Sequence, residues 1–316
     1  MADYDVFNGD ADGLCALHQL RLAEPRESVL VTGVKRDIGL LARVAAATDD
    51  RVTVLDISLD KNRSALARLL AAGAEVTYFD HHFAGDIPVH PGLAATIDTG
   101  AGLCTSLLVD RALAGRFRAW AVTAAFGDNL SAAAMLAAAP LALTAAQIDT
   151  LRMLGESLNY NAYGESLDDL HFHPADLYRR VHDYSDPFAF IVEDTAFTRL
   201  RQGYLADMAH ARDCQPTAED GGGALYLLPD AAWSRRVSGA FANALANAHP
   251  QQAHAVLIPR HGGYQVSVRA PVAAPAGADS LCRQFENGGG RKSAAGINGL
   301  PESQLDAFSR KFFQAF

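Results

Sequence analysis

The hydrophobic positions in the N-terminal part of the chain form short apolar runs separated by longer amphipathic stretches. The runs have the length and composition of β-strands; they are Asp5–Phe7, Ser28–Thr32, Arg51–Leu55 and Glu75–Phe79. The stretches between them carry Leu and Ala at helical spacing; they are Leu14–Leu22, Ile38–Ala47 and Lys61–Ala72. Strands and helices that alternate at this rhythm predict an α/β fold with a doubly wound, mostly parallel sheet.

The pattern becomes helical after this predicted sheet. We expect a helix capped by Thr105 and Ser106, with an anion facing its N-terminus as the less favoured alternative. A long helix is expected over Ala119–Ala139, and a third helix is opened by the capping box Thr144–Gln147. The glycine run after Asp220 predicts a break. The elements expected beyond it are strands Ala224–Leu228, Ala253–Ile258 and Tyr264–Arg269, a helix over Ala231–Ala248, and a last helix from Glu302. We therefore predict two domains, residues 1–200 and a smaller α/β domain over 220–316, with a cleft between them.

Composition adds limits to this picture. The chain has 316 residues, is 49% hydrophobic and carries a net charge of −9, which disfavours a protein coated with basic nucleic-acid contacts. The four cysteines are scattered without a CxxC pair, which predicts a reducing, cytoplasmic environment. The N-terminal residues do not have the pattern of a signal peptide, and we expect no membrane span.

Acidic side chains stand where the apolar runs stop. The segment Asn8-Gly9-Asp10-Ala11-Asp12-Gly13 follows the first run, Asp56 ends the third, and Asp80-His81-His82 ends the fourth. Because ligands bind outside the carboxyl ends of parallel strands, we expect these carboxylates to meet in one crevice. Asp128, in the Gly-Asp-Asn that interrupts the alanine-rich helical region, is a candidate to join them.

These residue types suit a pair of divalent ions. Two such ions about 3.5–4 Å apart need several anionic ligands, and an imidazole adds preference for a transition metal over magnesium. We expect the Asp10-x-Asp12 pair to lie in extended backbone, where side chains at i and i+2 point the same way. Gly9 and Gly13 would let backbone approach the site closely.

The ordered motifs NGDADG, LD, DHH and GDN resemble those of the DHH phosphoesterase superfamily. The segment Gly288-Gly289-Gly290-Arg291 through Gly296 resembles the glycine-rich signature of the DHH-associated C-terminal domain, and Val266–Arg269 resembles the strand before it. This family includes RecJ-type exonucleases, nano-RNA and pAp phosphatases, cyclic-dinucleotide phosphodiesterases and some pyrophosphatases. The resemblance implies that residues 1–200 form the phosphoesterase domain with a helical connector, and that 220–316 bind substrate.

The resemblance also implies roles for individual residues. The metal ligands would be Asp10, Asp12, Asp56, His81 and Asp128, and Asp56 would bridge two ions, Mn²⁺ by preference with Mg²⁺ or Co²⁺ as substitutes. The catalytic pair would be His82, facing the scissile phosphate, and Asp80, which orients a neighbouring imidazole. The substrate contacts would come from Asn8, Arg269, Gly288, Gly289, Gly290 and Arg291.

The chain departs from the family pattern at two positions. Many relatives carry a histidine four residues before the first motif aspartate, where this chain has Val6. Arg291 stands where the C-terminal signature has histidine. Lys35 and Arg36 follow the second apolar run, and either a phosphate contact or a solvent-exposed helix start would explain them.

We therefore expect a metal-dependent phosphohydrolase or phosphodiesterase in which a metal-bridging water attacks a small nucleotide or short single-stranded oligonucleotide. The alternative is a non-catalytic nucleotide sensor or partner-binding module with a degenerate site, and the sequence leaves a homodimer open.

Overall fold

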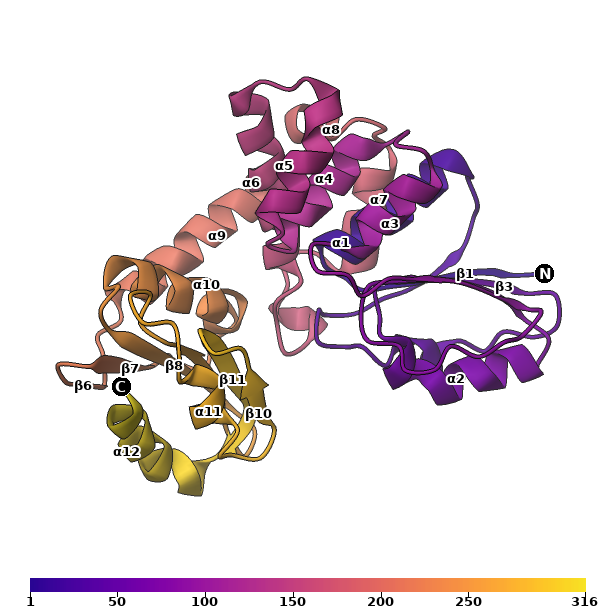
Figure 1. Cartoon of the computed structure of the whole chain (residues 1–316). Coiled ribbons are helices and arrows are strands. Elements are labelled where there is room, and N and C mark those ends of the chain that lie inside the picture. Colours follow the sequence, from indigo (N-terminus) through magenta and orange to yellow (C-terminus); the bar gives the residue numbers. More distant parts are fainter. The chain divides into compact units, whose positions relative to one another are not determined.

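The computed structural model describes residues 1–316 and divides into two compact units, Met1–Gly203 and Tyr204–Phe316. Figure 1 shows the helices and strands of both units. The α/β fold class expected from the sequence is confirmed, because unit 1 contains an all-parallel sheet and unit 2 a mixed sheet flanked by helices. The functional labels given to the two predicted domains stay predictions. No helix in the structure combines the length and the apolarity needed to cross a bilayer.

The sheet of unit 1 has five parallel strands in the order β2-β1-β3-β4-β5. Their bounds are β1 Asp3–Phe7, β2 Val29–Val31, β3 Arg51–Leu55, β4 Glu75–Asp80 and β5 Leu93–Ile97. The register places Phe7 beside Leu55 and Leu55 beside Phe79, so these apolar side chains share one face. The edge strand β5 was not predicted from the sequence. The strand order reverses between β1 and β3, which is the switch point where doubly wound sheets bind ligands.

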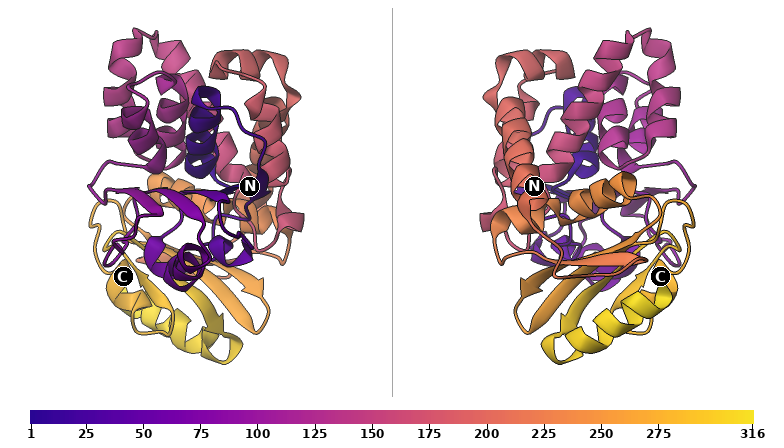
Figure 2. Two further views of the ribbon diagram at one scale, coloured as in Figure 1. Left: turned by 90° about the vertical axis from the view of Figure 1, so that its right-hand side faces the viewer. Right: turned by 90° about the vertical axis from the view of Figure 1, so that its left-hand side faces the viewer.

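Helices cover both faces of this sheet (Figures 1 and 2). One face packs on a layer that includes α1 Ala11–Ala23, α3 Thr105–Ala112, α4 Arg118–Gly127 and α6 Ala145–Asn161. The other face packs on α2 Leu59–Ala71 and the short 3₁₀ helix η1 Leu40–Arg43. The remaining helices of unit 1 are α5 Ser131–Ala138, η2 Ala139–Leu141, η3 Leu167–Asp169, α7 Pro174–His182 and α8 Pro187–Glu193. The long helix α9, Thr195–Asp213, continues from unit 1 into unit 2.

Two helix predictions were wrong. The segment Ile38–Ala47 forms only η1, because the Asn62 side chain of α2 bonds the backbone at Ile38 and Leu41 in place of helical partners. The predicted helix Ala119–Ala139 breaks into α4 and α5. Asn129 adopts a left-handed φ of 61°, which ends α4 and places Asp128 at its C-cap.

Unit 2 is built on a six-stranded sheet in the order β10-β11-β9-β8-β7-β6. Its strands are β6 Ala218–Glu219, β7 Gly223–Leu227, β8 Ala253–Arg260, β9 Gly263–Arg269, β10 Gly288–Gly290 and β11 Ala294–Pro301. Only β7 and β8 pair in parallel. The helices are α10 Ala232–Ala248, α11 Ala278–Cys282, η4 Glu302–Gln304 and α12 Leu305–Ala315. Helices α10 and α12 lie on opposite faces of the sheet (Figure 2, right).

A buried ion pair ties β1 to α1. The carboxylate of Asp5 accepts from Arg21 Nε at 2.8 Å and from Ser28 Oγ at 2.6 Å, and the Arg21 guanidinium also donates to Thr53 Oγ1. Both charged side chains are almost fully buried, with exposed fractions of 3% for Arg21 and 1% for Asp5. Removing one partner would leave the other as an isolated charge in the core.

We predict that Arg21→Met lowers the free energy of unfolding by about 3–5 kcal/mol, because Asp5 is left buried and unpaired. Urea denaturation measures the loss. Arg111→Met, at a 61% exposed side chain whose nearest carboxylate oxygen is 3.9 Å away, is the matched control and should cost no more than about 0.5 kcal/mol. Equal losses in the two variants would contradict the prediction.

His18 on α1 is a neutral core residue whose pKa burial lowers to about 3. Its Nε2 lies 2.8 Å from the carbonyl oxygen of Tyr184, and the ring meets Trp120 edge-on. The unfolded chain protonates His18 below pH 6.5, whereas the folded chain keeps it neutral down to about pH 3. Its contribution to stability is therefore complete above pH 6.5 and is lost as the pH falls through this window.

We predict that His18→Gln, which keeps an N–H donor but does not titrate, loses less stability than the wild type on acidification. The difference between the two proteins should change by about 3 kcal/mol between pH 6.5 and pH 4. Urea midpoints measured across this range test it, and parallel curves for the two proteins would contradict it.

Candidate metal centre

The strand ends of unit 1 deliver most of the predicted acids to one edge of the sheet. Asp10 follows β1, Asp56 follows β3 and Asp80 ends β4. All three are buried, as is Asp12 in the first turn of α1. The neighbourhood expected from the strand-end pattern is therefore present in the structure, although the roles of its members stay predictions.

The Asp10–Asp12 pair does not lie in extended backbone as expected. Asp10 is the N-cap of α1, and its Oδ1 accepts from the N–H groups of Asp12 and Gly13 at 3.0 and 3.1 Å. Asp12 lies on the first helical turn, so the two carboxylates point to different partners. The close approach expected of Gly13 is present, because a Cβ there would stand 2.2 Å from the carbonyl oxygen of Asn8.

Asp12 binds the N-terminus of α3. Its two carboxylate oxygens accept from the backbone N–H groups of Thr105 and Ser106, each at 2.7 Å. We had expected Thr105 and Ser106 to cap this helix with their own hydroxyls, which is wrong: Cys104 is the N-cap and makes no side-chain cap bond. The helix N-terminus instead stabilises the negative charge of Asp12 through its free N–H groups and dipole.

Asp56 is held in a conformation that side chains seldom adopt. Its φ is +60°, and its Oδ1 accepts from Thr105 Oγ1 at 3.0 Å. Burial raises the pKa of Asp56 well above its usual range, and the neighbouring charges of Asp12, Asp10, Asp128 and Asp80 raise it further. An added cation would relieve this repulsion.

The two histidines of the DHH segment have different surroundings. His81 Nδ1 lies 2.9 Å from the carbonyl oxygen of Leu103, so Nδ1 donates to it and Nε2 is the ring nitrogen that faces the carboxylates. That Nε2 lies 3.4 Å from Asp56 Oδ1, and 3.9 Å from both Asp12 Oδ2 and Asp128 Oδ2.

His82 is paired with Asp80, at 2.7 Å from Nδ1 to Oδ1, and its side chain is 45% exposed. This hydrogen bond raises the pKa of His82, against the opposing effect of burial. The predicted orientation of an imidazole by Asp80 therefore has a matching contact in the structure.

Asp128 and a lysine complete the cluster. Burial raises the pKa of Asp128 to about 6, with the charge of Asp12 adding to the rise and Lys35 opposing it. Lys35 Nζ lies 2.5 Å from Asp10 Oδ2 and 3.4 Å from Asp128 Oδ1. Burial is the largest single effect on Asp10 and acts to raise its pKa, but the charge and hydrogen bond of Lys35, with hydrogen bonds from Gly13 and Asp56, together lower it. The sequence pattern placed Lys35 at this rim and did not predict that its ammonium would point into the carboxylates.

The chemistry of these donors fits a divalent ion beside His81. The three carboxylates that face His81 Nε2 repel one another, and a cation between them would relieve this repulsion. The groupings of potential ligand atoms that lie within 4.8 Å of one another are Asp12–His81–Asp128 and Asp56–His81–His82. Both include His81, whose Nδ1–H contact with Leu103 is the outer-sphere hydrogen bond typical of metal-binding histidines. One imidazole with carboxylates suits a divalent metal ion.

Asn8 is used inside the protein. Its amide Nδ2 donates to the carbonyl oxygen of Lys35 at 3.3 Å, and its Oδ1 accepts from the N–H of Asp10 at 3.2 Å. The side chain is buried and fixes the loop that carries Asp10. These contacts give Asn8 a positioning role, and its contact with substrate stays a prediction.

The predicted substrate residues of the C-terminal signature lie in unit 2. Gly288, Gly289 and Gly290 form β10, the edge strand of its sheet, so one row of their backbone groups has no strand partner. A Cβ at Gly288 would stand 1.9 Å from the carbonyl oxygen of Cys282, so packing alone requires that glycine. Arg291 follows the strand, and Arg269 at the end of β9 donates to Asn243 Oδ1 at 2.5 Å.

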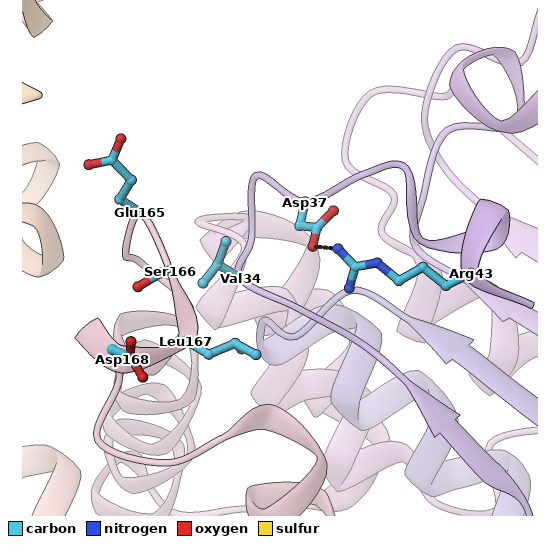
Figure 3. Close-up of a pocket in the computed structure, with 7 residues that line it drawn as sticks. All are labelled: Val34, Asp37, Arg43, Glu165, Ser166, Leu167 and Asp168. Atoms are coloured by element: carbon cyan, nitrogen blue, oxygen red, sulfur yellow. Dashed lines mark hydrogen bonds and ion pairs between the residues drawn. The ribbon is translucent and has the colours of Figure 1, made fainter. Parts of the chain in front are cut away.

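An open pocket of about 390 Å³ lies on unit 1 beside the loop that precedes Lys35 (Figure 3). Its lining combines an ion-paired Arg43 and Asp37 with the acidic 165–168 turn; the full lining is Val34, Asp37, Arg43, Glu165, Ser166, Leu167 and Asp168. None of the predicted site residues lines it. Its charges are mostly negative, so it is not a phosphate pocket.

No protein-family model matches the chain, and no curated protein matches its sequence. Solved structures do match. A DHH domain described as belonging to a family of ribosomal proteins has a TM-score of 0.63 at 12% identity, covering 99% of this chain and 86% of that one. The exonuclease RecJ bound to manganese has a TM-score of 0.54 at 19% identity, covering 99% and 90%. A pGpG-specific phosphodiesterase, PggH from Vibrio cholerae, has a TM-score of 0.52 at 12% identity, covering 98% of each chain.

The chain therefore shares the fold of the DHH-domain proteins, which confirms at the level of fold the resemblance seen in the motifs.

We predict that Mn²⁺ stabilises the folded chain through His81. At about 100 times its dissociation constant the ion should add about 2.7 kcal/mol to the free energy of unfolding, visible as a rise in Tm. His81→Ala should remove most of this rise. His90→Ala, at an exposed histidine outside the cluster, is the control and should keep it. An undiminished rise in His81→Ala would contradict the assignment.

Proposed function

We propose that this chain, with its DHH fold, is a divalent-metal-dependent phosphoesterase. The observation that carries the proposal is the arrangement around His81 Nε2, which three carboxylates from separate elements surround at 3.4–3.9 Å. Asp12, Asp56, His81 and Asp128 would hold the ion. When bound, such an ion polarises a phosphoryl oxygen and lowers the pKa of a bound water.

The protein's own residues would supply the remaining functions. Asp80 fixes the His82 ring through Nδ1, and the raised pKa of His82 favours its protonated form. We assign to His82 Nε2 the donation of a hydrogen bond to the phosphate and of a proton to the leaving oxygen. Leu103 fixes the His81 ring, and the N-terminus of α3 fixes the Asp12 carboxylate.

The substrate that we propose is a small nucleotide or a short single-stranded oligonucleotide. The support comes from the family resemblance of the motifs and from structural neighbours described as an exonuclease and as a pGpG-specific phosphodiesterase. Mn²⁺ is the proposed ion because RecJ is described as bound to manganese, and Mg²⁺ or Co²⁺ are alternatives. Arg269, the 288–290 strand and Arg291 are proposed substrate contacts of unit 2.

The second candidate is a nucleotide sensor without turnover. Lys35 favours it, because a fixed ammonium in the carboxylate cluster leaves less room for catalytic metal. The two candidates differ in one observable, which is product formation under saturating metal.

We predict that the purified chain with Mn²⁺ hydrolyses at least one of pGpG, pAp, short RNA or bis-p-nitrophenyl phosphate. Asp56→Asn should abolish turnover, because the ion loses a central ligand. His82→Ala should lower kcat by about 100-fold or more, through loss of the proton donor. Product release followed by chromatography measures both.

The matched controls are Asp149→Asn, at a side chain 65% exposed on α6, and His90→Ala, and both should keep wild-type turnover. Tight nucleotide binding by calorimetry without turnover in Mn²⁺, Co²⁺ or Mg²⁺ would overturn the enzyme and support the sensor.

A further inference from the structure

Lys35 occupies an unusual position for a lysine. The segment that carries it is fixed by its own backbone, because Lys35 N–H donates to the carbonyl oxygen of Ala162 at 2.9 Å and its carbonyl accepts from Asn8 Nδ2. The side chain then runs inward and is only 25% exposed. A flexible surface lysine has no such anchoring.

The ammonium group is fully coordinated by oxygen. Its nitrogen lies 2.5 Å from Asp10 Oδ2, 3.1 Å from Asn159 Oδ1 and 3.4 Å from Asp128 Oδ1. A lysine ammonium has three N–H donors, and here three oxygens from three separate segments receive them. This is the coordination that a small cation would have at the same point.

Both carboxylate oxygens of Asp10 already have hydrogen-bond donors within the protein. Its Oδ1 accepts from two N–H groups at the start of α1, and its Oδ2 faces the ammonium. Asp10 also belongs to neither of the two groupings of potential ligand atoms around His81. Val6, four residues earlier, is fully buried in the hydrophobic core on the α2 face and offers no ligand.

A divalent ion beside Asp10 would therefore meet a fixed positive charge. Like charges in a site with little water repel strongly, and the ammonium cannot leave without breaking three hydrogen bonds. On the His81 side the ammonium contacts Asp128 at 3.4 Å, whereas Asp12 and Asp56 are held by neutral N–H and O–H donors, which do not balance a negative charge.

We propose that the Lys35 ammonium replaces one of the two divalent ions, so that this site binds a single ion, held by Asp12, Asp56, His81 and Asp128. This inference rests on the proposed function, because it assumes that the site binds a divalent metal ion. It concerns the metal count of the chain, which is measured without any substrate.

The test is the number of Mn²⁺ ions bound per chain, by native mass spectrometry, with electron paramagnetic resonance as a second readout. The wild type should bind one ion and give the spectrum of an isolated Mn²⁺. Lys35→Met and Lys35→Gln remove the charge, so a second ion should enter beside Asp10 and give an exchange-coupled pair. Lys35→Arg keeps the charge and should bind one ion.

Lys61→Met is the matched control, because Lys61 is 63% exposed on α2, and it should bind one ion like the wild type. Two ions or none in the wild type would overturn the proposal, and so would a single ion in folded Lys35→Met and Lys35→Gln. Circular dichroism shows whether each variant is folded. If Lys35→Met does not fold, Lys35→Gln serves in its place, because its amide keeps a hydrogen-bond donor to Asp10. A wild type that binds two ions or none overturns the proposal whether or not the neutral variants fold.

An experimental result can contradict one of the two proposals without contradicting the other. A wild type that binds one ion and hydrolyses nothing removes the phosphoesterase, and the ion count in folded Lys35→Met and Lys35→Gln still decides the role of Lys35. A wild type that binds two ions and hydrolyses phosphoesters does the reverse.

Discussion

Negative charge buried at the carboxyl edge of the parallel sheet is the constraint on which the rest of unit 1 depends. Asp10, Asp12, Asp56 and Asp80 are all almost inaccessible to water, and Asp128 lies beside them. Carboxylates in such a place need compensating positive charge or hydrogen-bond donors. The structure supplies the N-terminus of α1 to Asp10, the N-terminus of α3 to Asp12, the Thr105 hydroxyl to Asp56 and the His82 ring to Asp80. The negative charge that these donors do not balance lies around His81.

The architecture of unit 1 follows from this constraint. A sheet with helices on both faces buries its strands and places the strand ends at one edge, where helix N-termini are also available. The break between α4 and α5 places one more carboxylate at this edge. The left-handed conformation of Asn129 ends α4 and leaves Asp128 at the helix end, beside the cluster. Lys35 lies on the loop after β2 and supplies a positive charge that is covalently part of the protein.

Much of this arrangement was predictable. The four predicted strands form at the expected places, and the order of NGDADG, LD, DHH and GDN along the chain indicated which side chains would gather. The errors have local causes. The segment Ile38–Ala47 has helical composition, but the Asn62 side chain takes its backbone partners. Thr105 and Ser106 are good capping residues, but they lie in the first turn of α3, where their N–H groups bind Asp12 and their hydroxyls donate to Asp56 and to the carbonyl oxygen of Asp12.

The amino-acid pattern alone was enough to place the strands and the acidic residues at the sheet edge, because an apolar run of strand length must be buried and the residue that follows it stands at the carboxyl end of the strand. Only the tertiary structure decided which carboxylate meets which donor. Asp12 contacts Thr105 and Lys35 contacts Asp128, each across 93 positions of sequence, and no periodicity or local propensity specifies contacts of that separation. The direction of one flexible lysine, and with it the charge left for a metal ion to balance, depends on the packing of segments that are far apart in the chain.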